Sequence, residues 1–76
     1  MNNILKLLGT SYSMTLEYDY FEEGYRVTIR DRNAHAAQIT FCAAAAEEAK
    51  NDILTWAIED CIYEIKQHAK HEGENK

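Results

Sequence analysis

Apolar and polar side chains alternate along the chain between residues 14 and 41, which is the period of strands with one buried face. Short polar segments divide this stretch into three runs. The apolar positions are Met14, Leu16, Tyr18 and Tyr20 in the first run, Tyr25, Val27 and Ile29 in the second, and Ala37, Ile39 and Phe41 in the third. The pattern predicts a three-stranded antiparallel meander over residues 14–41.

Charge along the first two runs predicts how they pair. A two-residue turn at residues 23–24 aligns apolar side chains on one face and places Glu17 opposite Arg30 on the other, and such opposite-charge pairs stabilise a sheet. In the second turn, over residues 31–34, Asn33 is expected to adopt the left-handed conformation, which asparagine tolerates well.

Helical periodicity flanks the sheet on both sides. Residues 1–9 predict a short helix that is capped by Asn2 or Asn3 and ends at Gly9. Residues 43–70 follow a 3.6-residue period that gathers Leu54, Ala57, Ile58, Cys61, Ile62 and Ile65 on one arc. We therefore predict an α+β fold in a single domain over residues 1–76: a short helix, the meander, a long helix packed on one sheet face, and a loose tail over 71–76.

The composition limits the classes of function. The 76 residues carry 13 acidic and 8 basic side chains, for a net charge of −5, which argues against a phosphate-binding surface built from clustered lysine and arginine. No apolar run approaches the length of a membrane span, and two cysteines make no disulfide framework. We expect a cytoplasmic protein that contacts neither membranes nor nucleic acid directly.

Motifs of catalysis do not occur in the sequence. It holds no G-x-S-x-G, no glycine-rich phosphate loop and no H-E-x-x-H. Cys42 follows the third predicted run, but no sequence motif pairs it with a histidine that could activate its thiol. The expected class is therefore a non-enzyme without a cofactor.

Aromatic and acidic residues of the long helix are the main candidates for binding a protein partner. Trp56 and Tyr63 are seven residues apart and lie along one line, away from the apolar arc. Two alternatives remain for them: a partner-binding surface, or burial beneath the amino-terminal segment or a second copy of the chain. The candidate partner-binding residues are Glu48, Asp52, Trp56, Glu59, Asp60 and Tyr63 on the helix, with Arg26 and Arg30 on the sheet.

A second stripe on the same helix has side chains that can ligate zinc. Its members follow spacings of three, four and three residues, and His35 could add a ligand from a loop; the stripe is Cys61, Glu64, His68 and His71. Side chains on one straight helix project in parallel and rarely close a tetrahedral site. The favoured interpretation is a core position for Cys61 and no metal.

Two segments resemble the HicB-like antitoxin domains: Glu23-Gly24-Tyr25-Arg26-Val27-Thr28-Ile29-Arg30-Asp31, and residues 47–56, which open with Glu47-Glu48-Ala49. The shared features are an acidic hairpin tip, a G-Y-x-V strand and a helix that opens with E-E-A. The resemblance implies a domain that binds and silences a small RNA-cleaving toxin. The element order is also similar to that of double-stranded RNA-binding domains, whose basic last helix is acidic here.

These observations predict a small acidic binding protein that inhibits a nucleic-acid-handling protein. In style it resembles the stand-alone inhibitors of bacterial viruses and mobile elements, including anti-CRISPR proteins. The expected partner is a nuclease, an RNA-guided complex or a toxin. The alternatives are the HicB-like antitoxin module and a structural homo-oligomer, with a homodimer as its simplest form.

Overall fold

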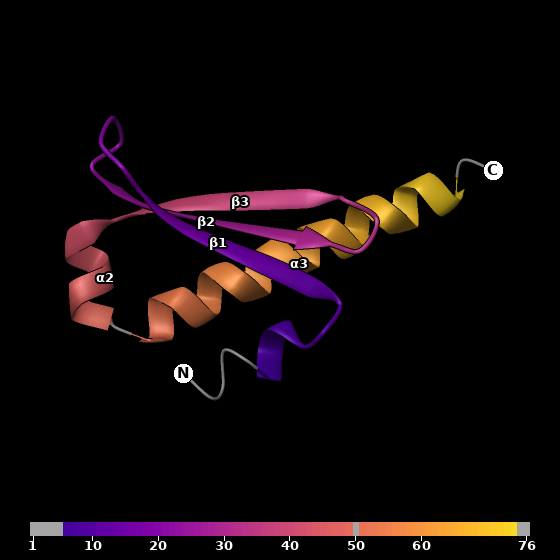
Figure 1. Cartoon of the computed structure of the whole chain (residues 1–76), viewed down its shortest axis with the longest axis horizontal. Coiled ribbons are helices and arrows are strands. Elements are labelled where there is room, and N and C mark those ends of the chain that lie inside the picture. Colours follow the sequence, from indigo (N-terminus) through magenta and orange to yellow (C-terminus); the bar gives the residue numbers. More distant parts are fainter. Residues whose placement is uncertain (1–5, 50, 75–76) are drawn as a thin grey trace.

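The chain folds into an α+β structure in which a long helix crosses one face of a three-stranded sheet (Figure 1). The computed structural model describes the backbone of residues 6–49 and 51–74 and the side chains of residues 6–49 and 52–70. The elements are β1 (Tyr12–Asp19), β2 (Gly24–Asp31), β3 (Ala36–Cys42), α2 (Ala43–Ala49) and α3 (Asn51–Glu74). The predicted fold class is confirmed.

A short helical turn precedes the sheet. Residues 6–8 are helical, and the turn that follows contains Gly9 with a φ of 62°. A left-handed residue at this place ends a helix, and glycine adopts it without steric cost. The predicted end at Gly9 is confirmed, whereas the expected caps Asn2 and Asn3 lie outside the described residues.

The sheet is an antiparallel meander in the order β1-β2-β3, so β1 and β3 are its two edges. The predicted pairing of β1 with β2 is wrong. Glu17 lies opposite Arg26 rather than Arg30, and four residues between Asp19 and Gly24, instead of two, form the turn. The shift between the two registers is even, so each side chain keeps its predicted face of the sheet.

Asp19 explains the longer turn. Its Oδ1 accepts hydrogen bonds from the backbone N–H of Phe21 at 2.9 Å and of Glu22 at 3.1 Å. Glu23 then adopts a φ of 53° and returns the chain to β2. An aspartate that caps the amides two and three residues further on is a common start of a turn, so the last residue of β1 fixes where the hairpin reverses.

Asp31 organises the second turn in the same way. Its Oδ1 accepts the N–H of Asn33 at 2.9 Å and that of His35 at 2.8 Å, and its backbone pairs with Ala34 and His35. The left-handed residue is Ala34, with a φ of 67°, and the prediction for Asn33 is wrong. The turn therefore holds an alanine in a conformation that strains its Cβ.

Gly24 is required where β2 approaches β3. A Cβ atom built at this position would lie 2.2 Å from the carbonyl oxygen of Phe41. No side chain fits at that distance, so the close approach of the two strands at this end of the sheet depends on glycine.

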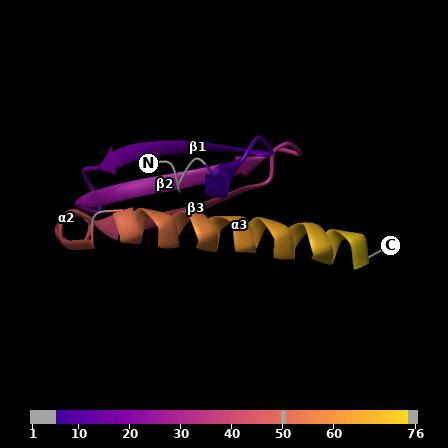
Figure 2. The same cartoon turned by 90° about the horizontal axis from the view of Figure 1, so that it is seen from below.

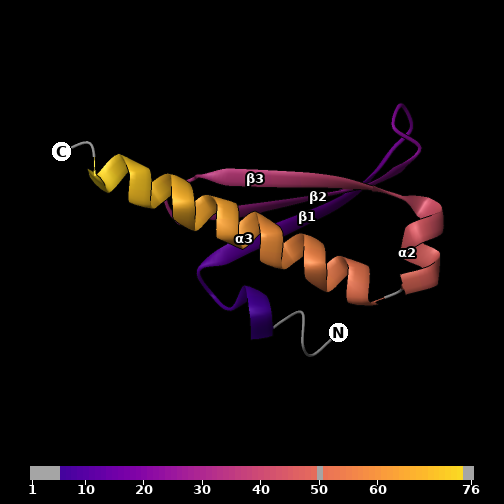
Figure 3. The same ribbon diagram turned by 180° about the vertical axis from the view of Figure 1, so that it is seen from behind.

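The single helix expected over residues 43–70 is divided into α2 and α3, which run in different directions (Figure 3). A straight helix that starts at the end of β3 would leave the sheet, because 28 residues extend about 42 Å. The change of direction returns the chain beneath the sheet. The four alanines of residues 43–46 fit any helical face, which is why periodicity alone did not reveal the division. Helix α3 also continues past the predicted stop at Gly73.

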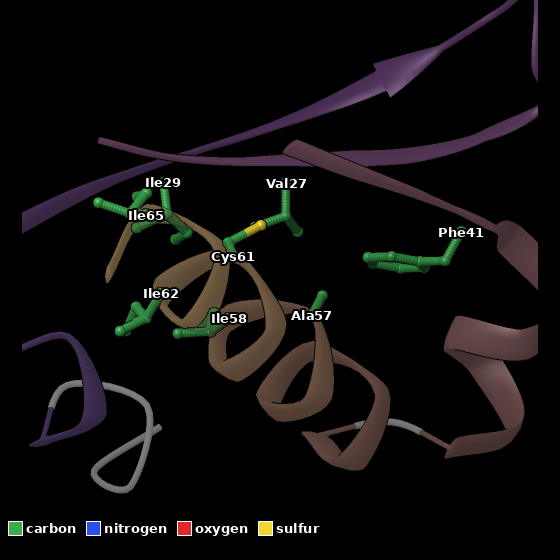
Figure 4. Packing of buried hydrophobic residues seen from close by; sticks show 8 residues of the cluster. All are labelled: Val27, Ile29, Phe41, Ala57, Ile58, Cys61, Ile62 and Ile65. Carbon is green, nitrogen blue, oxygen red and sulfur yellow. The ribbon is translucent and has the colours of Figure 1, made fainter. Parts of the chain in front are cut away.

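The core is small and lies between the sheet and α3 (Figure 4). Helix α3 packs mainly against β2 and β3. Eight apolar residues are buried, three from the sheet and five from α3: Val27, Ile29, Phe41, Ala57, Ile58, Cys61, Ile62 and Ile65. All five α3 residues belong to the predicted apolar arc, or to its continuation, and that part of the prediction is confirmed.

The molecule is a thin, two-layered body (Figure 2). It measures 44 × 29 × 15 Å and has a radius of gyration of 13.2 Å, compared with about 11.4 Å for a compact chain of this length. The sheet face opposite α3 is covered by no element among the described residues. Much of the surface therefore remains available for contact with other molecules.

Candidate protein-binding surface

The outer side of α3 carries a line of four side chains that point away from the sheet. Asp52, Trp56, Glu59 and Tyr63 follow spacings of four, three and four residues, which place them on one side of a helix. All four are exposed, with 52% of Trp56 and 61% of Tyr63 accessible to solvent. We call these four residues the α3 stripe. The described residues leave both aromatic rings exposed, and residues 1–5 of the amino-terminal segment that was the alternative cover lie outside the described residues.

The stripe has a shallow groove at one side, where the amino-terminal turn meets α3. Leu7 and Tyr12 line it together with Ile62, Tyr63 and Lys66, and Glu59 completes the wall. The groove has a volume of about 260 Å³. Its lining is mainly apolar and includes one acidic and one basic group, so a partner side chain could extend from the stripe into it.

The other predicted partner-binding residues lie elsewhere. Asp60 is half-buried on the flank of α3, and exposed Glu48 belongs to α2. Arg26 and Arg30 alternate with the buried Val27 and Ile29 along β2, so they occupy the opposite side of the sheet. The eight candidates are therefore not gathered on one surface, and the α3 stripe holds four of them.

Arg26 is engaged within the sheet. Its guanidinium forms a salt bridge with the carboxylate of Asp19, whose side chain is 7% exposed. The N–H of Glu22 is the main cause that lowers the pKa of Asp19; the N–H of Phe21 and the charge of Arg26 add to it, while partial burial opposes them. Arg30 donates to the carbonyl of Ala34 at 3.3 Å. Both arginines thus support hairpins, which weakens their assignment to a binding surface.

The residues of the predicted zinc stripe are not brought together. Among the described side chains, no group of three or more histidine, cysteine, aspartate or glutamate residues could hold a metal ion. His35 and His68 meet edge to face, with ring centroids 5.6 Å apart, beside a pocket of about 200 Å³ that Glu64 also lines. His35 lies 3.3 Å from the Asp31 carboxylate. The side chain of His71 is outside the described residues.

Cys61 faces the sheet and lies in the core, with its sulfur directed toward Val27 (Figure 4). Burial, assisted by the charges of Asp60 and Glu64, raises the pKa of its thiol to about 11. A thiol of this kind stays protonated near neutral pH and is a poor metal ligand. Cys42 is exposed at the end of β3.

Sequence reasoning missed a second group of exposed apolar side chains. Leu16 and Tyr18 were assigned to the buried face of the first strand, and they lie on that face, yet 48% and 43% of their surfaces are accessible. At the hairpin tip Tyr20 is 84% and Phe21 98% exposed. Alternation assigns a side chain to a face, but it cannot tell how far the helix covers that face.

Comparisons of the chain with protein-family models, curated proteins and solved structures give no match. Within the described part of the chain, neither helix combines the length and the apolar character that a membrane crossing requires.

Proposed function

We propose that this protein is a small non-enzymatic inhibitor that docks its α3 stripe on a basic, nucleic-acid-binding groove of another protein. The observation that carries the proposal is the exposure of Trp56 and Tyr63 in line with Asp52 and Glu59. Exposed aromatic rings supply much of the contact energy of protein interfaces. Carboxylates on the same line attract a basic surface and set the orientation of the complex.

The geometry of α3 supports this mode of binding. A helix of 24 residues extends about 36 Å, and its sheet-facing side is fixed by Ile58, Cys61 and Ile65 in the core. The two aromatic rings are seven residues, or about 10 Å, apart along the axis. A rigid helix that presents two anchors loses little conformational entropy when it binds.

The partner class follows from charge. The protein carries a net charge of −5, and its aromatic anchors stand beside acidic groups. Such a surface competes with nucleic acid for a groove lined by lysine and arginine. A nuclease, an RNA-guided complex and an RNA-cleaving toxin all bind nucleic acid and are the expected partners, and the protein resembles in style the inhibitors made by bacterial viruses and mobile elements.

A capture experiment with paired variants tests the proposal. Tagged parent protein is compared with a Trp56→Ala/Tyr63→Ala variant, and Tyr20→Ala serves as the control because its aromatic ring, at the hairpin tip, is even more exposed than the two stripe rings. Asp52→Lys/Glu59→Lys is compared with Glu22→Lys/Glu23→Lys, which changes the net charge equally at the tip. Mass spectrometry identifies the captured proteins.

The proposal predicts that the parent and both tip variants retain a nucleic-acid-handling enzyme from a bacterial lysate, and that both α3 variants lose it. If the α3 variants still captured the enzyme, the proposed role of the α3 stripe in binding would be overturned. Capture of proteins that bind no nucleic acid would overturn the partner class.

A further inference from the structure

The free edge of β1 combines two features that rarely remain exposed in a monomer. β1 is an eight-residue edge strand whose outer side faces no other strand of the sheet. Helix α3 packs on β2 and β3, so it leaves Leu16 and Tyr18 half-exposed on the face that β1 shares with the core. Long edge strands with apolar side chains pair readily with another strand.

The amount of exposed surface leaves room for a contact with another molecule. The chain exposes 5768 Å², which is about 1,000 Å² more than a compact monomer of this mass exposes. A specific interface of standard size buries about 800 Å² on each partner. The excess is therefore large enough for one such interface per chain.

Self-pairing of β1 is compatible with its own side chains. In an antiparallel pair, residues directly opposite share a face, so only even registers keep the apolar side of both copies together. Pairing Leu16 with Leu16 of the second copy places Met14 opposite Tyr18, and Thr15 opposite Glu17. The next register toward the carboxyl end would place Glu17 opposite its own copy and set two carboxylates together.

We propose that two copies of this chain associate through their β1 edges, antiparallel and with Leu16 on the two-fold axis, into one continuous sheet. The pairing satisfies the edge backbone groups of both strands and covers Leu16 and Tyr18. Because the α3 stripe points away from the sheet, the dimer leaves both stripes exposed. This inference is independent of the proposed function, since it uses a different surface.

Light scattering on the parent and on Leu16→Glu tests the interface. Leu16 is half-exposed in the monomer, so the variant is expected to fold, which circular dichroism checks; Gln38→Glu at the exposed β3 edge is the control. We expect the parent and the control to be dimeric at micromolar concentration, and Leu16→Glu to weaken association at least tenfold. A parent that is monomeric at millimolar concentration, or a dimer indifferent to Leu16→Glu, overturns the proposal.

Disulfide trapping tests the register without a destabilising charge. In a Cys42→Ser background, Leu16→Cys places one thiol opposite its copy at a distance that a disulfide can span. Mild oxidation should cross-link Leu16→Cys rapidly and leave Gln38→Cys uncross-linked. Equal or faster cross-linking of Gln38→Cys would overturn the assignment of the interface to β1.

Discussion

Asp19 and Arg26 join the two strands of the first hairpin through a salt bridge, and the same carboxylate caps the turn between them. One side chain therefore fixes both the length of the turn and the register of the sheet. The register predicted from the sequence also pairs opposite charges, because it places Glu17 opposite Arg30. It has a turn of two residues, however, and leaves the amides of Phe21 and Glu22 without the Asp19 acceptor.

Replacing this carboxylate should change how stability depends on pH. The pKa of Asp19 is lowered in the folded protein, so its ionised form stabilises the fold above the ordinary aspartate pKa of about 4, and this stability is lost as the pH falls through the lower folded value. The unfolding free energy of Asp19→Asn should be below that of the parent near neutral pH, and the gap should narrow in acid. Urea titrations of both proteins over a pH series measure this difference in unfolding free energy. A difference that stays constant into acid would contradict the stabilising role of ionised Asp19.

The left-handed alanine of the second turn predicts a stabilising substitution. Ala34 has a φ of 67°, which costs a residue with a Cβ about 1–2 kcal/mol. Ala34→Gly removes this strain at some cost in chain entropy and should raise the unfolding free energy by about 0.5–1 kcal/mol. The matched change Ala44→Gly, on exposed helix α2, should lower it by about 1 kcal/mol. Thermal melts of the two variants should move in opposite directions.

Core and surface positions of α3 should respond very differently to truncation. Ile58 is fully buried, and Ile58→Ala should cost about 2–5 kcal/mol, much of the stability of so small a core. Trp56→Ala, only two residues away but on the exposed stripe, should change the unfolding free energy by less than about 1 kcal/mol. Denaturant titrations compare them, and a Trp56 variant as unstable as the Ile58 variant would place the indole in the core.

The two thiols should differ in reactivity. Cys42 is exposed, whereas Cys61 is buried with a pKa of about 11, so about 0.1% of Cys61 is thiolate at pH 8. A thiol reagent should label one cysteine per folded chain rapidly and the second only after unfolding. Cys42→Ser should abolish the rapid phase; two rapid thiols in the parent would contradict the core position of Cys61.

The division between what could and could not be predicted has a physical cause. Periodicity identifies faces, and so the sequence was sufficient to predict the meander, the α+β class and the core positions Ile58, Cys61 and Ile65. Register depends on the local capping of the turn by Asp19 and on its salt bridge with Arg26, and pairing charges between the strands does not reveal either contact. The break between α2 and α3 follows from the need to return beneath the sheet, and the alanines that precede it carry no directional signal.

The sequence predicted which side chains of the candidate surface share one side of the helix, but not which of them are exposed. Spacing placed Trp56 and Tyr63 on one line, but their exposure depended on where the amino-terminal turn packs, and Leu7 meets the groove beside Tyr63 without covering its ring. Arg26 appeared available in the sequence and is instead held by Asp19. The exposed edge of β1 had no sequence signal, because the position of α3 relative to the strands determines it.

Competition with nucleic acid is the most direct test of the proposed function. The enzyme captured through the α3 stripe is purified, and the affinity of the parent protein for it is measured with and without the enzyme's own RNA or DNA, at low and at high salt. The account predicts that protein and nucleic acid exclude each other and that affinity falls steeply as salt rises. The proposed function would be contradicted if the protein, the enzyme and the nucleic acid formed a ternary complex, with an affinity of the protein for the enzyme that neither nucleic acid nor salt changes.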